Sequence, residues 1–321
     1  MKPNIWVSSS QAKEMLTKQL ATWELARKNY EDFKNIKYKV FSFGGFEIKV
    51  QFNPSRVKSA GANINSDALK KRKCFLCPDH LPIEQVRLPF GSQYLVLCNP
   101  YPIFPEHFTI STRLHQPQLI KGRYGDMLEM ARRLDQFTIF YNGPQSGASA
   151  PDHAHFQAGT RDYMPLDYER GKIQNKCSLL LENADGEIYT LKNYLRNGFI
   201  TTSADIKSAE KLFETIYESM ETPKGDITEP KMNLFCRYEN NIWTTIVIPR
   251  KEHRPRQYYA TGTDHLLTSP GAADMGGLFI ISQPDDFEKI SAPILADIYE
   301  QLCLSGEEID RIGDIIKTRC Q

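Results

Sequence analysis

The sequence predicts an α+β protein with two related halves, each a mainly antiparallel sheet flanked by helices. Its 321 residues are enough for a large core and two similar halves. Short segments rich in β-branched and aromatic residues recur between turns, and segments with helical periodicity flank them. A strand followed by Pro249 and His253 echoes residues 102–112, which indicates a weak internal repeat. We therefore place the halves at residues 1–160 and 161–321.

The first elements along the chain are a helix and a hairpin. Apolar residues recur at roughly helical spacing over residues 11–34, after the serines of residues 8–10, so one long amphipathic helix is expected. Residues 37–52 alternate around Gly44 and Gly45, the pattern of two paired strands joined by a tight turn. Residues 57–73 are polar and are expected to form a connector. Residues 93–98 and 107–112 are expected to be strands.

Composition excludes several classes of protein. The net charge is +1, with 40 basic and 39 acidic residues, which argues against a strongly basic nucleic-acid-binding surface. No run of 18 apolar residues occurs, so no membrane span or membrane partner is expected. The first residues lack the apolar core of a signal peptide. Seven cysteines, an odd number, suit a reducing cytoplasm better than a disulfide framework.

The stretch with the clearest chemistry is residues 137–160. Residues 137–141 favour a strand, and residues 142–152 form a loop of small residues whose backbone N–H groups could approach an anion. If the following residues are a strand, His153, His155 and Gln157 share one face, since side chains alternate. An imidazole can attack phosphorus at neutral pH, and a neighbouring amide can hydrogen-bond a phosphate oxygen. Two histidines that serve only packing are the alternative.

The motif His153-x-His155-x-Gln157, after an Asn-Gly…Gly-x-Ser loop, resembles the histidine-triad superfamily in its transferase branch. That branch includes galactose-1-phosphate uridylyltransferase, diadenosine tetraphosphate phosphorylase and GDP-L-galactose phosphorylase. The resemblance implies that each half has a histidine-triad-like fold and that His155 takes the nucleotidyl group covalently. The hydrolase branch has a third histidine at the position of Gln157, so glutamine implies a transferase or phosphorylase.

The resemblance also implies a set of substrate-binding residues. An Asn/Pro/Arg segment helps to hold the nucleotide in relatives, and Arg56 could pair with phosphate through two hydrogen bonds. An exposed arginine after a turn is the alternative for Arg56. A cluster of Arg250, Lys251 and Arg254 suits a phosphate or another anionic acceptor. The expected substrate-binding residues are Asn53, Arg56, Asn142, Ser146, Gly147, Ser149 and Arg254.

Cys74 and Cys77 form a Cys-x-x-Cys motif. Such a motif occurs in zinc sites and in redox pairs, and it can also arise by chance. No second cysteine pair exists, so further ligands of a metal would be histidines. The uridylyltransferase pattern supplies His115 and His153 as the third and fourth ligands. The result would be a closed, structural Zn²⁺ site with two cysteines and two histidines. The sequence leaves open an additional catalytic Mg²⁺.

The second half is expected to complete the substrate pocket without a His-x-His motif of its own. Strands are expected at residues 178–181, 187–191, 232–238, 242–248 and 278–282, and helices at residues 204–220, 285–304 and 306–319. Residues 269–277 form a second Gly-rich loop, which does not fit the phosphate-binding P-loop pattern. This loop would approach the acceptor or would simply form a turn before a strand.

The expected function is nucleotidyl transfer through a covalent nucleotidyl-His155 intermediate. The donor would be a nucleotide sugar or a dinucleoside polyphosphate, and phosphate or a sugar 1-phosphate would accept the group. Gln157, Ser146, Ser149 and backbone N–H groups would stabilise the developing negative charge. Two rival functions are a histidine-triad hydrolase and a non-catalytic, zinc-stabilised nucleotide-binding protein. A homodimer is compatible with each of these functions.

Overall fold

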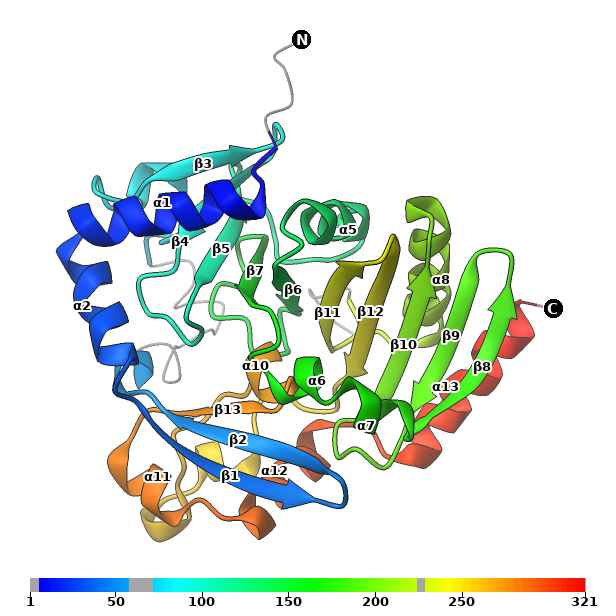
Figure 1. Ribbon diagram of the computed structural model, residues 1–321. Helices are drawn as coiled ribbons and strands as arrows, with labels where there is room; N and C mark the ends of the chain where they lie inside the picture. The colour runs from blue at the N-terminus through cyan, green and yellow to red at the C-terminus, as the bar shows by residue number, and fades with distance from the viewer. Residues whose placement is uncertain (1–5, 58–71, 224–228, 321) are drawn as a thin grey trace.

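The structure, a computed structural model, describes residues 6–57, 72–223 and 229–320. A ten-stranded sheet crosses the molecule in the order β3-β4-β5-β7-β6-β11-β12-β10-β9-β8 (Figure 1). All neighbouring strands in it are antiparallel. The strands are β3 Arg87–Phe90, β4 Tyr94–Cys98, β5 His107–Thr112, β6 Phe137–Asn142, β7 His155–Thr160, β8 Cys177–Asn183, β9 Gly186–Leu191, β10 Gly198–Ser203, β11 Met232–Glu239 and β12 Ile242–Pro249.

The two sides of this sheet have the same strand order. From the edge to the centre one side reads β3-β4-β5-β7-β6 and the other β8-β9-β10-β12-β11, so the fifth strand of each side lies between the third and the fourth. A helix follows the third strand on each side, α5 (Tyr124–Arg133) and α8 (Ile206–Ser219). The two sides meet where β6 pairs with β11. The predicted α+β class with antiparallel sheets is confirmed.

A smaller sheet joins both ends of the chain. It has the order β1-β2-β13, with β1 (Lys37–Phe43), β2 (Phe46–Phe52) and β13 (Leu278–Ile281). The predicted hairpin turn is present, and Gly44 and Gly45 have φ of +50° and +99°, in the left-handed region that glycine adopts without strain. β13 runs parallel to β2. The segment after β13 therefore lies beside the segment after β2, and the Asn53 N–H donates to the Ile281 carbonyl at 2.7 Å.

Two apolar cores cover the two faces of the large sheet. The first core packs one face against α1 (Ser9–Thr22), α2 (Glu24–Phe33), α5, α8 and α13 (Gly306–Arg319). The second core packs the other face against the smaller sheet and a set of mostly short helices. These helices are α6 Pro165–Tyr168, α7 Arg170–Gln174, α10 Ala272–Met275, α11 Pro284–Lys289 and α12 Ala292–Leu302. The remaining short helices are η1 Pro54–Arg56, η2 Pro78–His80, α9 Arg256–Tyr259 and η3 Gly262–Asp264.

The structure differs from the sequence expectation in a few elements. The helix expected over residues 11–34 breaks at Trp23, whose extended backbone (φ −117°, ψ 100°) ends α1 and whose side chain is buried. The helix expected over residues 285–304 is divided into α11 and α12. Strands β3 and β10 were not expected. Most of the connector at residues 57–73 lies outside the described residues. None of the described helices has the length and apolar character needed to cross a membrane.

Candidate functional site

The His-x-His-x-Gln segment lies on the central strand pair of the first side of the sheet. Gln157 pairs with Phe140 of β6, so both side chains lie on the face covered by the second core. β7 begins at His155 rather than at His153, because a turn closed by the His153 N–H and the Ala150 carbonyl (3.2 Å) precedes it. The expectation that His153 shares a strand face with His155 is therefore wrong, and its ring points to Cys74 and Cys77 instead.

The ring of His155 is fixed in one tautomer. Its Nδ1 lies 2.8 Å from the carbonyl oxygen of His153, which can only accept, so Nδ1 carries the proton and donates. Nε2 therefore keeps its lone pair. Burial lowers the pKa of His155 to about 4, so the ring is neutral at pH 7. The backbone N–H of His155 donates to the side-chain oxygen of Gln118 at 2.7 Å, which holds the start of β7 in place.

Gln157 is held by a histidine from the neighbouring strand. His107, the first residue of β5, lies with its Nε2 2.9 Å from Oε1 of Gln157. The backbone N–H of Ile103 donates to Nδ1 of His107 at 3.3 Å, so Nε2 carries the proton and donates to Gln157. Burial lowers the pKa of His107 to about 3, and the positive charge of Arg56 acts in the same direction. This contact leaves the NH₂ group of Gln157 available to donate to a ligand.

The small-residue loop between β6 and β7 packs against the second Gly-rich loop. Gly147 has a φ of +90°, and a Cβ there would lie 2.3 Å from Cα of Gly271, so only glycine fits. The side-chain oxygen of Asn142 accepts from the Ala272 backbone N–H at 2.6 Å and from the Asn233 amide at 3.1 Å. The loop before β13 is thereby tied to β6, the strand that precedes the small-residue loop.

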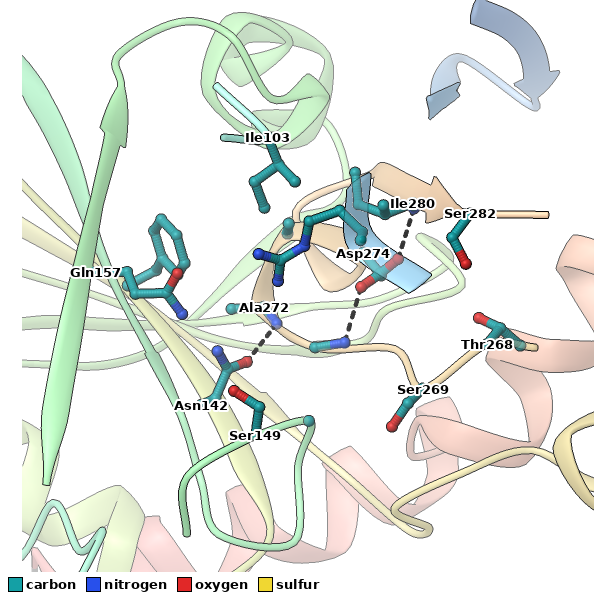
Figure 2. Close-up of a pocket in the computed structure, with 15 residues that line it drawn as sticks. Ile103, Asn142, Ser149, Gln157, Thr268, Ser269, Ala272, Asp274, Ile280 and Ser282 are labelled. Atoms are coloured by element: carbon teal, nitrogen blue, oxygen red, sulfur yellow. Dashed lines mark hydrogen bonds between the residues drawn. The ribbon is translucent and has the colours of Figure 1, made fainter. Parts of the chain in front are cut away.

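The two loops border one narrow cleft of about 80 Å³ (Figure 2). Five of the expected residues line it together, namely Arg56, Asn142, Gly147, Ser149 and Gln157. His155 is not among the lining residues, although it lies two positions before Gln157 on the same strand face and is 6% exposed. Ligand pockets commonly measure about 300–1,000 Å³, so this cleft is smaller than a typical nucleotide site.

The other expected substrate-binding residues lie around the cleft without lining it. Asn53 is buried behind it and donates to the Pro102 carbonyl at 2.8 Å. Ser146 is fully buried, and its hydroxyl has no hydrogen-bond partner within the described chain. Arg254 donates from Nε to the Ser269 hydroxyl at 2.9 Å. Ser269 itself lines the cleft.

The cleft also contains residues that the sequence did not single out. They come from the second Gly-rich loop, from β13 and from the proline-rich turn before β5, and include Thr268, Ser269, Asp274, Ser282, Ile103 and Ile280. The carboxylate of Asp274 accepts the backbone N–H groups of Gly271 and Ile280, both at 2.8 Å, and burial raises its pKa to about 6. The Gly-rich composition of residues 269–277 was the only signal for this wall.

Arg56 is a half-buried cation in the wall of the cleft. Its Nη1 donates to the Tyr101 carbonyl at 3.1 Å, and burial lowers its pKa to about 10. Asp274 counteracts this shift through its negative charge. A guanidinium at this depth is strongly attracted to an anion, because little water screens it. Arg56 thus supplies positive charge to the cleft wall next to Gln157 and the catalytic loop.

Cys74, Cys77, His115 and His153 converge on one point beside the start of β7. One ligand atom from each lies within 4.8 Å of all the others. Cys74 Sγ lies 3.3 Å from His153 Nδ1, and Cys77 Sγ lies 3.2 Å from His115 Nδ1. His153 donates from Nε2 to the Thr112 carbonyl at 2.8 Å, which leaves the lone pair of Nδ1 directed at the sulfurs. The group could hold a metal ion, and two thiols with two imidazoles suit tetrahedral Zn²⁺.

A family model described as a domain of unknown function, DUF4922, matches residues 15–160. Diadenosine 5',5'''-P1,P4-tetraphosphate phosphorylase 2 of Saccharomyces cerevisiae is 30% identical over 122 residues, 34% of this chain. The aligned segment spans only 37% of that relative.

Crystal structures of yeast Ap4A phosphorylase Apa2 have a similar fold. The complex with AMP gives a TM-score of 0.59 at 17% identity and covers 91% of this chain and 97% of that one. The complex with Ap4A gives 0.59 at 15% identity and covers 94% and 99%. The chain thus shares the α+β fold of these structures, and over 122 residues it is also similar in sequence to a diadenosine tetraphosphate phosphorylase, as the predicted resemblance implies.

Proposed function

We propose that the protein is a phosphorylase that cleaves a dinucleoside polyphosphate and transfers a nucleoside monophosphate group to inorganic phosphate. The similarity in sequence to a yeast diadenosine tetraphosphate phosphorylase and in fold to its complexes with AMP and Ap4A supports this substrate class. A nucleotide sugar as donor and a sugar 1-phosphate as acceptor form the second substrate pair that the site chemistry allows.

The observation that carries the proposal is the tautomer of His155. The His153 carbonyl holds the Nδ1 proton, so the lone pair of Nε2 is available without prior deprotonation. The lowered pKa keeps this nitrogen unprotonated at neutral pH. A buried histidine with only a packing role does not need a free nitrogen beside a loop of small residues and a fixed glutamine.

The transfer proceeds in two displacements at the same phosphorus. The Nε2 lone pair of His155 forms a P–N bond to the α-phosphorus, and the P–O bond to the leaving polyphosphate breaks, with the electron pair going to the leaving oxygen. The Nδ1 proton stays with the ring and stabilises the imidazolium by its bond to the His153 carbonyl. In the second step an oxygen of inorganic phosphate forms a new P–O bond, the P–N bond breaks, and neutral His155 is restored.

Two steps suit this cleft because both the leaving group and the acceptor are anionic. Unit charges 4 Å apart repel by about 4 kcal/mol at an effective dielectric of 20. A covalent carrier lets the leaving group depart before the acceptor enters. In a cleft of about 80 Å³ the two anions would otherwise have to occupy the same confined space.

Charge on the nonbridging oxygens would be stabilised by groups already oriented in the cleft. The NH₂ group of Gln157 is directed by the bond from His107 to its carbonyl oxygen. Arg56, the hydroxyl of Ser149 and the N–H groups around Gly147 line the same cleft. Donors fixed before the reaction cost little reorganisation when charge develops.

Cys74, Cys77, His115 and His153 would hold a structural Zn²⁺, which would supply folding free energy rather than chemistry. Because His153 also accepts the Nδ1 proton of His155 through its carbonyl, these ligands would orient the nucleophile. The shared strand order of the two sides of the sheet supports the proposal that residues 1–160 and 161–321 are related halves. A cytoplasmic location remains part of the proposal.

The test is covalent labelling in the absence of acceptor. The protein is incubated with a diadenosine polyphosphate labelled in its adenine, and the same experiment is run with His155→Ala and with His265→Ala, a histidine outside the cleft. We expect acid-labile, base-stable label on the parent protein and on His265→Ala, and none on His155→Ala. Phosphate should then discharge the label as a nucleoside diphosphate.

Three outcomes would change the assignment. Label on another residue, or full activity in His155→Ala, would remove His155 from the role of nucleophile. Release of nucleoside monophosphate at the same rate with and without phosphate would indicate a hydrolase. Tight nucleotide binding with no label from any dinucleoside polyphosphate or nucleotide sugar would indicate a binding protein.

A further inference from the structure

A second cavity, of about 300 Å³, lies over strands β8–β12 of the ten-stranded sheet. Phe235 in its wall is the cross-strand neighbour of Phe140, which lines the catalytic cleft, so both spaces lie on the same sheet face. Its floor comes from β9, β10, β11 and β12, and residues of α6 and α7 border it. Figure 1 shows these two short helices in front of this part of the sheet.

A packed wall separates this cavity from the catalytic cleft. A Cβ at Gly276 would lie 2.5 Å from Sδ of Met164 and 3.3 Å from the ring of Phe235, so these three residues are in tight contact. The backbone N–H of Leu166 donates to the Gly276 carbonyl at 2.9 Å. A ligand in the second cavity is therefore a separate molecule rather than the far end of a substrate held by His155.

The floor of the cavity contains no nucleophile comparable to His155. β12 contributes Thr244 and Ile246 to it, and β10 contributes Ile200 and Thr202. The isoleucines and Phe235 form an apolar surface on which a flat ring can lie. These side chains favour binding over group transfer.

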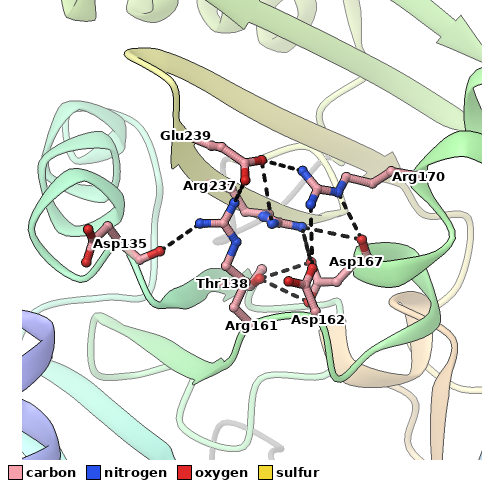
Figure 3. Close-up of polar contacts among 8 residues, drawn as sticks. All are labelled: Asp135, Thr138, Arg161, Asp162, Asp167, Arg170, Arg237 and Glu239. Carbon is pink, nitrogen blue, oxygen red and sulfur yellow. Dashed lines mark hydrogen bonds and ion pairs between the residues drawn. The ribbon is translucent and has the colours of Figure 1, made fainter.

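The polar rim carries one group with unused hydrogen-bonding capacity. Arg237 is 8% exposed, and its Nη1 faces Asp162 and Asp167 at 3.3 and 3.5 Å. Its Nη2 lies 3.9 Å from the Glu239 carboxylate without a hydrogen bond, and its buried Nε has no hydrogen-bond partner among the residues that the structure describes. Figure 3 shows the surrounding ion pairs, including the pair between Arg170 and Glu239 at 2.5 Å. A buried N–H without a hydrogen bond is costly, and a small shift of Arg237 toward the cavity would let a ligand carbonyl accept from it.

The charge of the lining residues restricts the ligand further. The cavity is lined by the carboxylates Asp167, Glu187 and Glu239 and by only two guanidinium groups, Arg170 and Arg237. Glu187 already accepts the Thr202 hydroxyl at 2.7 Å, so hydroxyl donors suit this wall. The excess of negative charge opposes a phosphorylated ligand. The cavity therefore favours a neutral, planar molecule with carbonyl acceptors and hydroxyl donors.

We propose that this second cavity, between the β9–β12 floor and helices α6 and α7, binds a neutral nucleoside at a site separate from the catalytic cleft. The heterocycle lies on Ile200, Ile246 and Phe235, its carbonyl edge meets Arg237, and its hydroxyls meet the carboxylates. The site is independent of the reaction at His155, because the Met164–Gly276 wall divides the two spaces.

Cys177 offers a readout confined to this cavity. It lines the cavity as a partly buried free thiol, whereas Cys320 is an exposed free thiol elsewhere on the surface. The full-length protein is treated with iodoacetamide at about pH 9, with and without adenosine, guanosine, uridine or cytidine, and the modified peptides are quantified by mass spectrometry. We expect at least one nucleoside to slow alkylation of Cys177 by about fivefold or more at saturation, with Cys320 unchanged.

Variants separate occupancy of the cavity from indirect protection. Ile246→Trp fills the floor and should abolish the effect of nucleoside on Cys177, and Ile200→Phe serves if that variant does not fold. The control Ile83→Trp replaces an isoleucine that is 94% exposed and should keep the full protection. Uridine 5'-monophosphate should protect Cys177 less than uridine does, and adenosine, whose base has no carbonyl group, should protect it least of the four nucleosides.

Two results would overturn the proposal. The first is alkylation of Cys177 at an unchanged rate with all four nucleosides at about 10 mM, a concentration that would reveal even weak sites. The second is protection that survives in both Ile246→Trp and Ile200→Phe, since the nucleoside would then act from elsewhere. Equal protection by the monophosphate would contradict the preference for a neutral ligand.

Discussion

The two sides of the ten-stranded sheet share one strand order and differ in what they present on the same face. The β3–β7 side presents His155 and Gln157 beside a small-residue loop, and Gln157 lines a cleft of about 80 Å³. The β8–β12 side presents Thr244 and Ile246 in a cavity of about 300 Å³. The cleft is bordered by two loops that touch at Gly147 and Gly271, whereas the cavity has an apolar floor.

This difference indicates that the sheet is a scaffold and that a few side chains determine the chemistry available on each side. Gln157 pairs with Phe140 as Ile246 pairs with Phe235, so Thr244 and Ile246 of β12 stand where β7 has His155 and Gln157. The metal-ligating group adds a second asymmetry, since within residues 6–57, 72–223 and 229–320 it occurs once, on the β3–β7 side. Each prediction below tests one part of this contrast.

The largest effect is expected from removing the nucleophile. His155→Ala should lower kcat by about 10⁴-fold or more, because loss of a nucleophile leaves only binding and charge stabilisation. Phosphate-dependent cleavage of a dinucleoside polyphosphate measures it, with His265→Ala as the matched control. Thermal stability should stay close to that of the parent, and a residual rate above one tenth of the parent rate would contradict a catalytic β3–β7 side.

The metal-ligating group should dominate the stability of that same side. Cys74→Ser or His115→Ala should lower both the zinc content and the melting temperature, the latter by about 5 °C or more, because loss of a metal removes folding free energy. Cys320→Ser, at an exposed cysteine, is the control. Elemental analysis and calorimetry measure the two quantities. Metal-free protein with an unchanged melting temperature would remove this asymmetry between the sides.

A smaller effect is expected from the hydrogen-bonded pair His107 and Gln157. Gln157→Ala should lower kcat by about 10- to 200-fold, since a hydrogen bond to a charged oxygen contributes roughly 1.5–3 kcal/mol. His107→Ala leaves the amide in place but frees its rotation, so a loss of about tenfold or less is expected, mainly in kcat rather than KM. A change confined to KM in both variants would indicate that the pair binds substrate without stabilising the transition state.

Local signals predicted most of the fold because period and turn chemistry were clear in those segments. The Gly44–Gly45 hairpin, β5 and the helix at residues 306–319 agree with expectation. β3 and β10 were missed because each is short or rich in glycine and threonine, and only pairing with neighbours defines them. The helix breaks at Trp23, whose side chain is buried in the core, and this tertiary contact cannot be predicted from the local sequence pattern.

The candidate site was predicted where its residues are adjacent in sequence and missed where the fold assembles it. The motif around His155 and the Cys-x-x-Cys pair are local patterns. The wall formed by Asp274 and the loop at residues 268–273 comes from the second half of the chain and reaches the cleft only because β13 pairs with β2. The role of His107 depends on its contact with Gln157, 50 residues away.

The smallest effect is expected at the seam between the two sides. Glu229 precedes β11, and its carboxylate accepts the hydroxyl of Tyr141 in β6 at 2.6 Å and the backbone N–H of Ile120. Burial raises the pKa of Glu229 to about 7 although these hydrogen bonds favour the charged form. Between about pH 4.5 and 7, Glu229 keeps its proton in the native state but has lost it in the unfolded chain. The free energy of unfolding therefore falls as pH rises through this range. Glu229→Gln should remove this fall. Between pH 4 and pH 8, the free energy of unfolding should therefore fall by about 1–3 kcal/mol less in Glu229→Gln than in the parent. Urea unfolding at both pH values measures the difference, with Glu221→Gln at an exposed glutamate as the control. Parallel pH profiles for Glu229→Gln and the parent would show that the seam does not carry this proton.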